Sequence, residues 1–313
     1  MKKFEEICMM TQAEVKTYMQ KYLSSKKYKV VNKDGYLYAK GTVPVLLVAH
    51  MDTVHKEICK KILIGDDGII SSPQGIGGDD RCGIFIIMNI VQDLNCSVLL
   101  CEDEETGGNG ARKFTKSEYI NDLDVNYIIE FDRKGNNDAV FYSCDNKDFT
   151  KFVTETTGFK EAFGTFSDIS VVAPAAKIAA VNLSCGYYNA HTLNEYVKIN
   201  EMLNTIKVAK KLIKTESDAF EYVARQYKNY NYYYGNSFND YYGRNKGYNS
   251  KQLGFSDYDK GVLDLELEIV FTDIDGEETF DYVSGKTKAE CWAKFFIDNP
   301  DVCFAMVTDY SFM

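Results

Sequence analysis

The sequence has 313 residues, with 46 acidic and 36 basic side chains, 45% hydrophobic residues and four prolines. This composition excludes a chain that is disordered throughout, and it supplies enough apolar material for one large domain or two ordinary ones. No apolar run reaches the roughly 20 residues of a membrane-spanning helix, so we expect no membrane partner. The nine cysteines follow no repeating spacing, which is typical of reduced thiols in a cytoplasmic protein.

The excess of acidic residues is confined to the end of the chain. Residues 257–313 hold 14 acidic and 4 basic side chains, which leaves 32 of each for residues 1–256. This asymmetry predicts two units with different roles. Because neither unit carries a net positive charge, nucleic acid is not expected as a partner.

The hydrophobic pattern of the first 222 residues alternates between strands and helices. A helix is predicted at 4–24, followed by a hairpin that turns at Asp34 and Gly35. The apolar run 43–49 is predicted to be a strand buried on both faces, and further strands are predicted at 97–101, 126–130 and 179–184. Helical segments, among them 82–94 and 196–214, separate these strands. The alternation predicts an α/β fold with a mixed, mostly parallel sheet between helices.

The remainder of the chain has a different composition. Residues 226–250 hold eight Tyr and six Asn, which predicts an irregular linker at 223–256. Stacking of these tyrosines on single-stranded bases is an alternative, but no basic groove accompanies them. Residues 257–313 are predicted to form a small acidic α+β module, with strands at 262–271, 279–283 and 302–308 and a helix at 287–298.

Side chains that bind metals follow several of the predicted strands. His50 ends the strand 43–49, and Asp52 comes two residues later, as expected for a metal ligand and the carboxylate that orients its ring. A strand-end histidine without a metal fits the same pattern. Asp132 follows the strand 126–130, and His191 follows the strand 179–184, with Glu195 four residues further on.

Two acidic clusters accompany these residues. The glycine-rich segment 75–78 leads into Asp79 and Asp80, which are suited to cap a helix or to bridge two cations. A phosphate site is disfavoured because the Lys-Ser/Thr pair of such loops is missing. Four acids at 102–105 follow the buried strand 97–101 and are not placed like a solvated surface run. Because the carboxyl ends of parallel strands meet at one edge of a sheet, we expect one common site.

Taken in order, these segments resemble the motifs of the co-catalytic dizinc exopeptidases, a superfamily that includes peptidase T-like tripeptidases, aminoacylase and carboxypeptidase relatives, and glutamyl and leucyl aminopeptidases. The resemblance covers about residues 25–215 and implies the zinc exopeptidase fold with two divalent metal ions, Zn in the first place, with Co or Mn as alternatives. The matching motifs are His50-Met51-Asp52, Gly78-Asp79-Asp80, Asp103-Glu104-Glu105-Thr106-Gly107, Asp132 and Ala190-His191-Thr192.

The resemblance also implies the role of each residue. Asp79 bridges the two metals, His50 and Asp132 complete one site, and Glu105 and His191 complete the other. Asp52 orients His50, Glu104 is the general base, and the peptide bond between Asp79 and Asp80 is cis. The chemistry agrees, because three carboxylates and a bridging hydroxide balance the four positive charges of two zinc ions.

The spacing of the motifs bears on the substrate. Only 59 positions separate Asp132 from His191, too few for the separate lid or dimerisation domain that the carboxypeptidase-like and tripeptidase members insert there. Lidless relatives are mainly aminopeptidases. We therefore predict an aminopeptidase that cleaves short peptides through a metal-bridging hydroxide. An N-acyl amino acid deacylase or carboxypeptidase-like amidohydrolase, and a non-catalytic binding protein, remain alternatives. The oligomeric state stays open, a homo-oligomer included.

Two further features have less specific interpretations. His55 matches no ligand position and is predicted to be a surface or loop histidine, with contact to substrate as the alternative. The segment 164–168 lies where the resembling enzymes place a substrate-lining loop. Ser167 or Asp168 is predicted to cap a helix there, and a contact between Asp168 and a substrate amine is the alternative.

Overall fold

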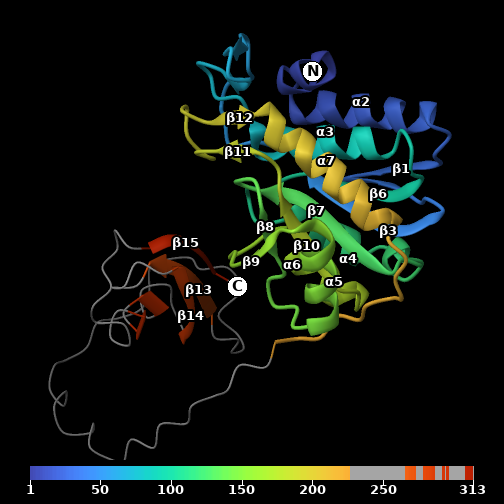
Figure 1. Ribbon diagram of the computed structural model, residues 1–313, viewed down its shortest axis with the longest axis vertical. Helices are drawn as coiled ribbons and strands as arrows, with labels where there is room; N and C mark the ends of the chain where they lie inside the picture. Colours follow the sequence, from blue (N-terminus) through green and yellow to red (C-terminus); the bar gives the residue numbers. More distant parts are fainter. Residues whose placement is uncertain (226–264, 273–277, 286–290, 293, 296–306, 313) are drawn as a thin grey trace, which may run out of the picture. The chain divides into compact units, whose positions relative to one another are not determined.

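The computed structural model describes residues 1–225, 265–272, 278–285, 291–292, 294–295 and 307–312. The chain divides into two compact units, Met1–Arg225 and Gln226–Met313, which are coloured along the sequence in Figure 1. Nearly all of the predicted linker therefore lies outside the described residues.

The first unit begins with two helices, α1 (Lys2–Cys8) and α2 (Gln12–Ser25), where the sequence predicted a single helix. The break has a local cause. Thr11 accepts a hydrogen bond from the backbone of Glu14, and the Glu14 side chain accepts one from the backbone of Thr11. This capping box starts a new helix at α2.

A sheet of eight strands forms the centre of the first unit. Its order is β1-β2-β6-β3-β7-β10-β8-β9, and β6, β3, β7 and β10 are parallel to one another. The predicted hairpin is β1 and β2, with Gly35 at φ 92°. The strands are β1 (Val30–Lys33), β2 (Tyr36–Ala39), β3 (Val43–His50), β6 (Cys96–Cys101), β7 (Tyr127–Arg133), β8 (Asp138–Val140), β9 (Lys160–Ala162) and β10 (Ala180–Ser184).

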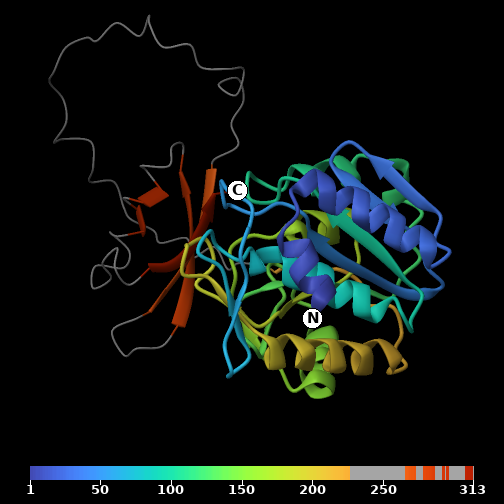
Figure 2. The same cartoon turned by 90° about the horizontal axis from the view of Figure 1, so that it is seen from above.

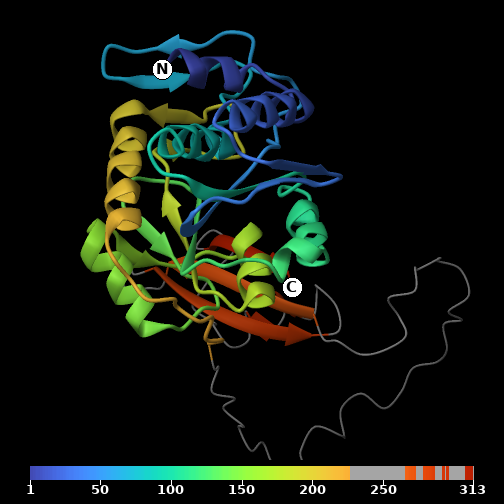
Figure 3. The same ribbon diagram turned by 90° about the vertical axis from the view of Figure 1, so that its right-hand side faces the viewer.

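Helices cover both faces of this sheet, as Figure 3 shows. Along β3, Leu47 and Ala49 belong to the core that contains α1, α2, α3, α5 and α7, whereas Leu46 and Val48 belong to the core that contains α4 and α6. The predicted α/β class is therefore confirmed. The helices are α3 (Gly78–Ile90), α4 (Asn109–Thr115), α5 (Lys147–Thr157), α6 (Asp168–Ala176) and α7 (Ile199–Lys214), with a 3-10 turn at Glu118–Ile120.

A second, smaller sheet has the order β11-β12-β5-β4 and lies at one end of the unit (Figure 2). The sequence pattern missed it because its strands have two or three residues, too few to show a period. One of its strands covers residues 196–198, which were predicted as the start of the helix 196–214. Its strands are β4 (Leu63–Ile64), β5 (Ile69–Ser71), β11 (Tyr187–Tyr188) and β12 (Tyr196–Lys198).

In the second unit the described residues form a three-stranded antiparallel sheet of order β14-β13-β15. The predicted helix at 287–298 lies largely outside the described residues, of which 291, 292, 294 and 295 are helical. The strands are β13 (Leu265–Thr272), β14 (Glu278–Gly285) and β15 (Val307–Phe312).

Two global expectations can be compared with the described part of the chain. None of its helices is both long and apolar enough to span a bilayer. Its eight cysteines are all free and buried. Burial raises the pKa of the Cys82 and Cys101 thiols well above the usual value, as expected for unreactive core cysteines.

Arg81 fastens the N-terminal helices to the end of β3. Its buried guanidinium donates hydrogen bonds to the backbone oxygens of Ile7 at 3.0 Å, Met10 at 3.0 Å and Met51 at 2.6 Å. Arg81→Met leaves these carbonyls without their donor and should lower the free energy of unfolding by roughly 2–5 kcal/mol. Urea denaturation measures this, with Arg112→Met at an exposed position as the control. Equal midpoints for the two variants would show that the three bonds contribute little.

Candidate metal centre

The order of the parallel strands brings the predicted ligands together. His50 ends the central strand β3, and the register pairs it with Cys101 at the end of β6. On the other side Val48 pairs with Glu130 of β7, which puts Asp132 level with His50. The acidic loop after β6 and the end of β7 therefore flank His50 from opposite sides.

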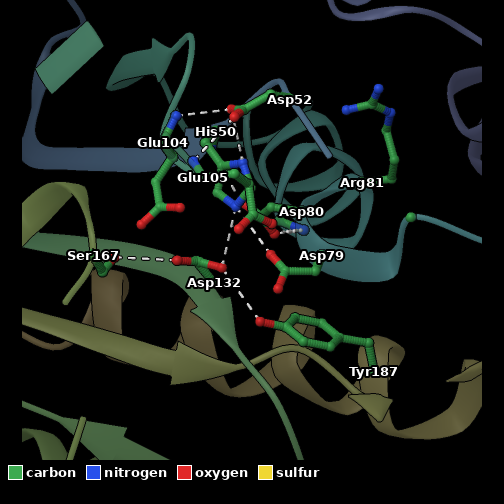
Figure 4. A network of polar contacts seen from close by, with 12 residues as sticks. His50, Asp52, Asp79, Asp80, Arg81, Glu104, Glu105, Asp132, Ser167 and Tyr187 are labelled. Atoms are coloured by element: carbon green, nitrogen blue, oxygen red, sulfur yellow. Dashed lines mark hydrogen bonds and ion pairs between the residues drawn. The ribbon is translucent and has the colours of Figure 1, made fainter. Parts of the chain in front are cut away.

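One half of the cluster surrounds the His50 ring, which is 1% exposed. Its Nε2 lies 3.0 Å from Oδ1 of Asp79 and 3.4 Å from Oδ1 of Asp132. Figure 4 shows the two carboxylates meeting the same edge of the ring, while Arg81 points away from it.

The other half of the cluster is built around His191. Its Nε2 lies 3.2 Å from Oδ2 of Asp79 and 3.1 Å from Oε2 of Glu105. The His191 side chain is 57% exposed, so this half faces solvent. Asp79 thus directs one oxygen toward each histidine, and all five predicted ligands are found in one place.

Asp52 makes more contacts than its predicted role required. Its Oδ1 lies 3.2 Å from Nδ1 of His50 and accepts a hydrogen bond from the backbone of Glu104 at 3.0 Å. Its Oδ2 accepts one from the backbone of Glu105 at 3.0 Å. Asp52 therefore orients the imidazole and also holds the backbone of the two neighbouring acids, an arrangement typical of the outer partners of metal ligands.

The start of α3 places Asp79 in the cluster. The peptide bond between Asp79 and Asp80 is cis, as the resemblance implied, and neither residue has helical dihedral angles. Asp80 is fully buried and accepts hydrogen bonds from the backbone of His50 at 3.1 Å and of Gly83 at 2.9 Å. Asp80 therefore joins the start of α3 to the end of β3.

A polar network supports Asp132 from behind. Its backbone N–H donates to Oδ1 of Asn182 at 2.8 Å, and its carboxylate accepts from Tyr187 at 3.3 Å and from Ser167 at 3.2 Å. Ser167 also donates to Glu130. Ser167 does occupy the N-cap position of α6, but its hydroxyl serves these carboxylates. Only the fold reveals this second role.

Two other sequence interpretations can be compared with the structure. Asp168 is fully buried, and burial raises the pKa of its carboxyl to about 7. His55 lies in a loop, but its side chain is only 8% exposed and its Nε2 lies 2.8 Å from Oε2 of Glu195. The prediction of a surface or loop histidine therefore holds for the loop, but the ring itself is largely buried. The sequence places its partner Glu195 four residues after His191 but gives no signal of a contact with His55.

The cluster carries strongly shifted pKa values. Burial raises the pKa of Asp132 to about 7 and that of Glu104 to about 10. Hydrogen bonds to Asp79 and Glu105 raise the pKa of His191 to about 11. Burial by itself lowers the pKa of His50, but the surrounding carboxylates, Asp132 first, raise it well above its usual value. Protons therefore neutralise much of the negative charge when no cation is bound.

The residues fit two zinc ions on three grounds. Tetrahedral zinc with ligands at about 2.0–2.1 Å separates its donor atoms by about 3.3 Å, and the four histidine–carboxylate separations are 3.0, 3.4, 3.2 and 3.1 Å. Oε1 of Glu105 is buried without a hydrogen-bond partner. Within the described residues, neither lysine nor arginine forms an ion pair with the three ligand carboxylates.

Metal affinity is expected to rise with pH. Zinc needs neutral imidazole and ionised carboxylate, and the pKa values of His191 and Asp132, about 11 and about 7, leave both groups protonated to a large extent near neutrality. Because metal binding displaces these protons, a lower proton concentration favours the metal-bound form. Competition with a chelator near pH 6 and near pH 8 measures the change. An affinity that falls toward pH 8 would contradict the assignment of these ligands.

Comparisons with known proteins concern the fold. No protein-family model matches the chain, and no curated protein matches it either. The aminopeptidase PepT structure from Bacillus cereus is 16% identical with a TM-score of 0.57, covering 68% of this chain and 96% of that one. A Staphylococcus aureus tripeptidase structure is 15% identical with a TM-score of 0.58, covering 67% and 96%.

A third structure, the PhTET1-12s dodecamer, is 15% identical with a TM-score of 0.51 and covers 67% of this chain and 98% of that one. At such identities the likeness extends to the fold and not to a shared activity. The resemblance read from the motifs is thus confirmed at the level of architecture: the chain has the α/β fold of these solved aminopeptidase and tripeptidase structures.

Proposed function

We propose that this chain is a dizinc metallohydrolase that cleaves an amide bond, and that its substrates are short peptides from which it removes the N-terminal residue. The observation that carries the proposal is the placement of Asp79. One carboxylate oxygen faces His50 and the other faces His191, and each histidine also faces a second carboxylate. Asp79 is thus shared by two groups of ligands, each with one histidine and one further carboxylate. Two such groups suit two cations and not one.

Glu104 is the proposed general base. It is 9% exposed, and Asp52 holds its backbone beside the ligands. Two bound divalent cations supply Lewis acidity toward the amide carbonyl and acidify water. Burial raises the pKa of Glu104 to about 10, and the charge of bound cations would lower it, so that the Glu104 carboxylate would accept a proton from water and return it to the leaving amine.

A pocket beside His191 offers room for the substrate. It has a volume of about 470 Å³ and is lined by His191, Leu193 and Val54, among others. This volume lies within the range of small-ligand sites. The chain between Asp132 and His191 belongs entirely to the first unit, where it forms β8, α5, β9, α6, β10, β11 and their connecting loops, which supports the prediction that no lid domain is inserted there.

The names of the similar structures, an aminopeptidase and a tripeptidase, support the choice of exopeptidase. One similar structure is a dodecamer, so the proposal includes a homo-oligomer, which light scattering tests. The free cysteines of the described residues support a reducing, cytoplasmic location.

The proposal is tested by metal analysis and a substrate panel. The reconstituted protein should hold two zinc ions per chain, visible by anomalous scattering at the zinc edge, and should hydrolyse amino-acid p-nitroanilides and di- or tripeptides. Turnover of N-acyl amino acids alone would identify a deacylase or carboxypeptidase-like enzyme. A protein that binds no metal after reconstitution would support the non-catalytic alternative.

A further inference from the structure

A buried carboxylate outside the ligand set holds the segment that carries Asp79. Glu195 precedes β12 and is 1% exposed. Its Oε1 accepts a hydrogen bond from the backbone of Asp79 at 2.9 Å, and its Oε2 accepts one from the backbone of Gly77 at 2.8 Å. The two oxygens of Glu195 therefore bind the backbone on either side of Gly78, where the glycine-rich segment enters α3.

The same carboxylate also holds His55. Nε2 of His55 lies 2.8 Å from Oε2 of Glu195, and His55 lines the pocket together with His191 and Leu193. One side chain thus contacts both the backbone of the central ligand and a residue of the pocket wall. An imidazole whose one nitrogen donates to a buried carboxylate is fixed in orientation.

The composition of the segment 75–78 follows from these contacts. A Cβ atom on Gly78 would lie 2.8 Å from side-chain atoms of Tyr187 and Val197 and 3.3 Å from Oε1 of Glu195. A Cβ atom on Gly75 would lie 2.2 Å from the His55 ring. The glycines therefore allow the backbone to approach Glu195 and His55 closely. This close approach explains the glycine-rich composition without a phosphate-binding site.

We propose that Glu195 is a positioning residue that places the Asp79 carboxylate for the two cations and fixes His55 in the wall of the substrate pocket. The inference rests on the proposed metallohydrolase function. Asp79 serves both halves of the cluster only if its two oxygens keep their directions toward His50 and His191. A hydrogen bond from its own backbone to a buried carboxylate restrains that orientation.

The first test compares Glu195→Gln with Glu201→Gln. Glutamine keeps the size of Glu195 but presents an NH₂ group to donors that need an acceptor. The zinc affinity of Glu195→Gln, measured by chelator competition, should fall about 10- to 100-fold, and the visible spectrum of the Co²⁺-loaded protein should change. Glu201 is the control, because it accepts bonds from Tyr188 and Lys198 and none from the glycine-rich segment.

Two further variants separate the two roles of Glu195. Gly78→Ala displaces the segment while leaving the Glu195 carboxylate intact, and it should weaken zinc binding in the same way even if Glu195→Gln does not fold. His55→Gln keeps a donor for Glu195 but removes the ring from the pocket. It should leave zinc affinity unchanged and raise KM for a peptide substrate with little change in kcat.

The outcomes distinguish this inference from the proposed function. A wild-type chain that binds no zinc overturns both. If the wild-type chain binds zinc, unchanged affinity and an unchanged Co²⁺ spectrum in both Glu195→Gln and Gly78→Ala overturn the positioning role alone. An equal loss of affinity in Glu201→Gln overturns it as well, because the effect is then not specific to Glu195. An unchanged KM in His55→Gln overturns the proposal that Glu195 fixes His55 as part of the substrate pocket.

Discussion

Glu104→Gln is expected to lower kcat roughly 10²- to 10⁴-fold while the protein still binds two zinc ions. Glutamine has nearly the same shape as glutamate, but its amide does not accept a proton from water. Glu104 is also absent from the predicted ligand set, and Asp52 holds it only through its backbone N–H, which the substitution keeps. Steady-state kinetics with a peptide p-nitroanilide and metal analysis of the same preparation measure the two quantities.

Glu118→Gln is the matched control for this variant. Glu118 is exposed at the start of a 3-10 turn, so the same chemical change there should alter neither kcat nor metal content. A Glu104→Gln enzyme that keeps its turnover would exclude Glu104 as the base. Loss of turnover together with loss of both metals would instead identify Glu104 as a residue that holds the metal site together.

Asp79→Asn is expected to abolish turnover and to reduce zinc binding to one ion per chain or fewer. Asparagine has one acceptor oxygen and no negative charge, whereas Asp79 directs an oxygen toward His50 and the other toward His191. Each metal site would lose a charged ligand. Without the Asp79 carboxylate between them, the two close cations would also repel each other more strongly. The affinity of each site should therefore fall by more than about 100-fold, beyond the effect of an outer partner.

The control for Asp79→Asn is Asp66→Asn, which changes an exposed acid of the loop between β4 and β5. It should bind two zinc ions with unchanged affinity. Titration with zinc followed by calorimetry gives the stoichiometry of both variants. Two tightly bound zinc ions in Asp79→Asn would show that Asp79 does not bridge, and the two groups of ligands around it would then need another explanation.

The fold class and the meeting of three strand-end segments were predictable from the sequence for a physical reason, whereas the ligand roles of Asp79 and His191 were what the family resemblance implied. The buried strands β3, β6 and β7 appear as apolar runs because both of their faces are covered, and their neighbours along the chain show directly which side chains follow each strand end. Parallel strands place those ends at one edge. His50, the acids after Cys101, and Asp132 were thus expected in one place, and the structure brings them there.

Two features of the first unit differ from the prediction, and one of them has a local signal in the sequence. Thr11 and Glu14 have the spacing of a capping box, which is a sequence signal for the break between α1 and α2. The strands β4, β5, β11 and β12 are too short to show a hydrophobic period. Their pairing is a property of the folded chain.

The sequence by itself determined the main parallel sheet of the first unit and the strand ends whose side chains meet at the candidate metal centre, because hydrophobic periodicity and the ends of parallel strands are local features. Only the tertiary structure decided that Asp52 also holds Glu104 and Glu105, and that Glu195 holds the backbone of Asp79. These hydrogen bonds join residues 52, 53 and 116 positions apart. Contacts at such distances depend on strand order and loop path, for which the residues themselves carry no periodic signal.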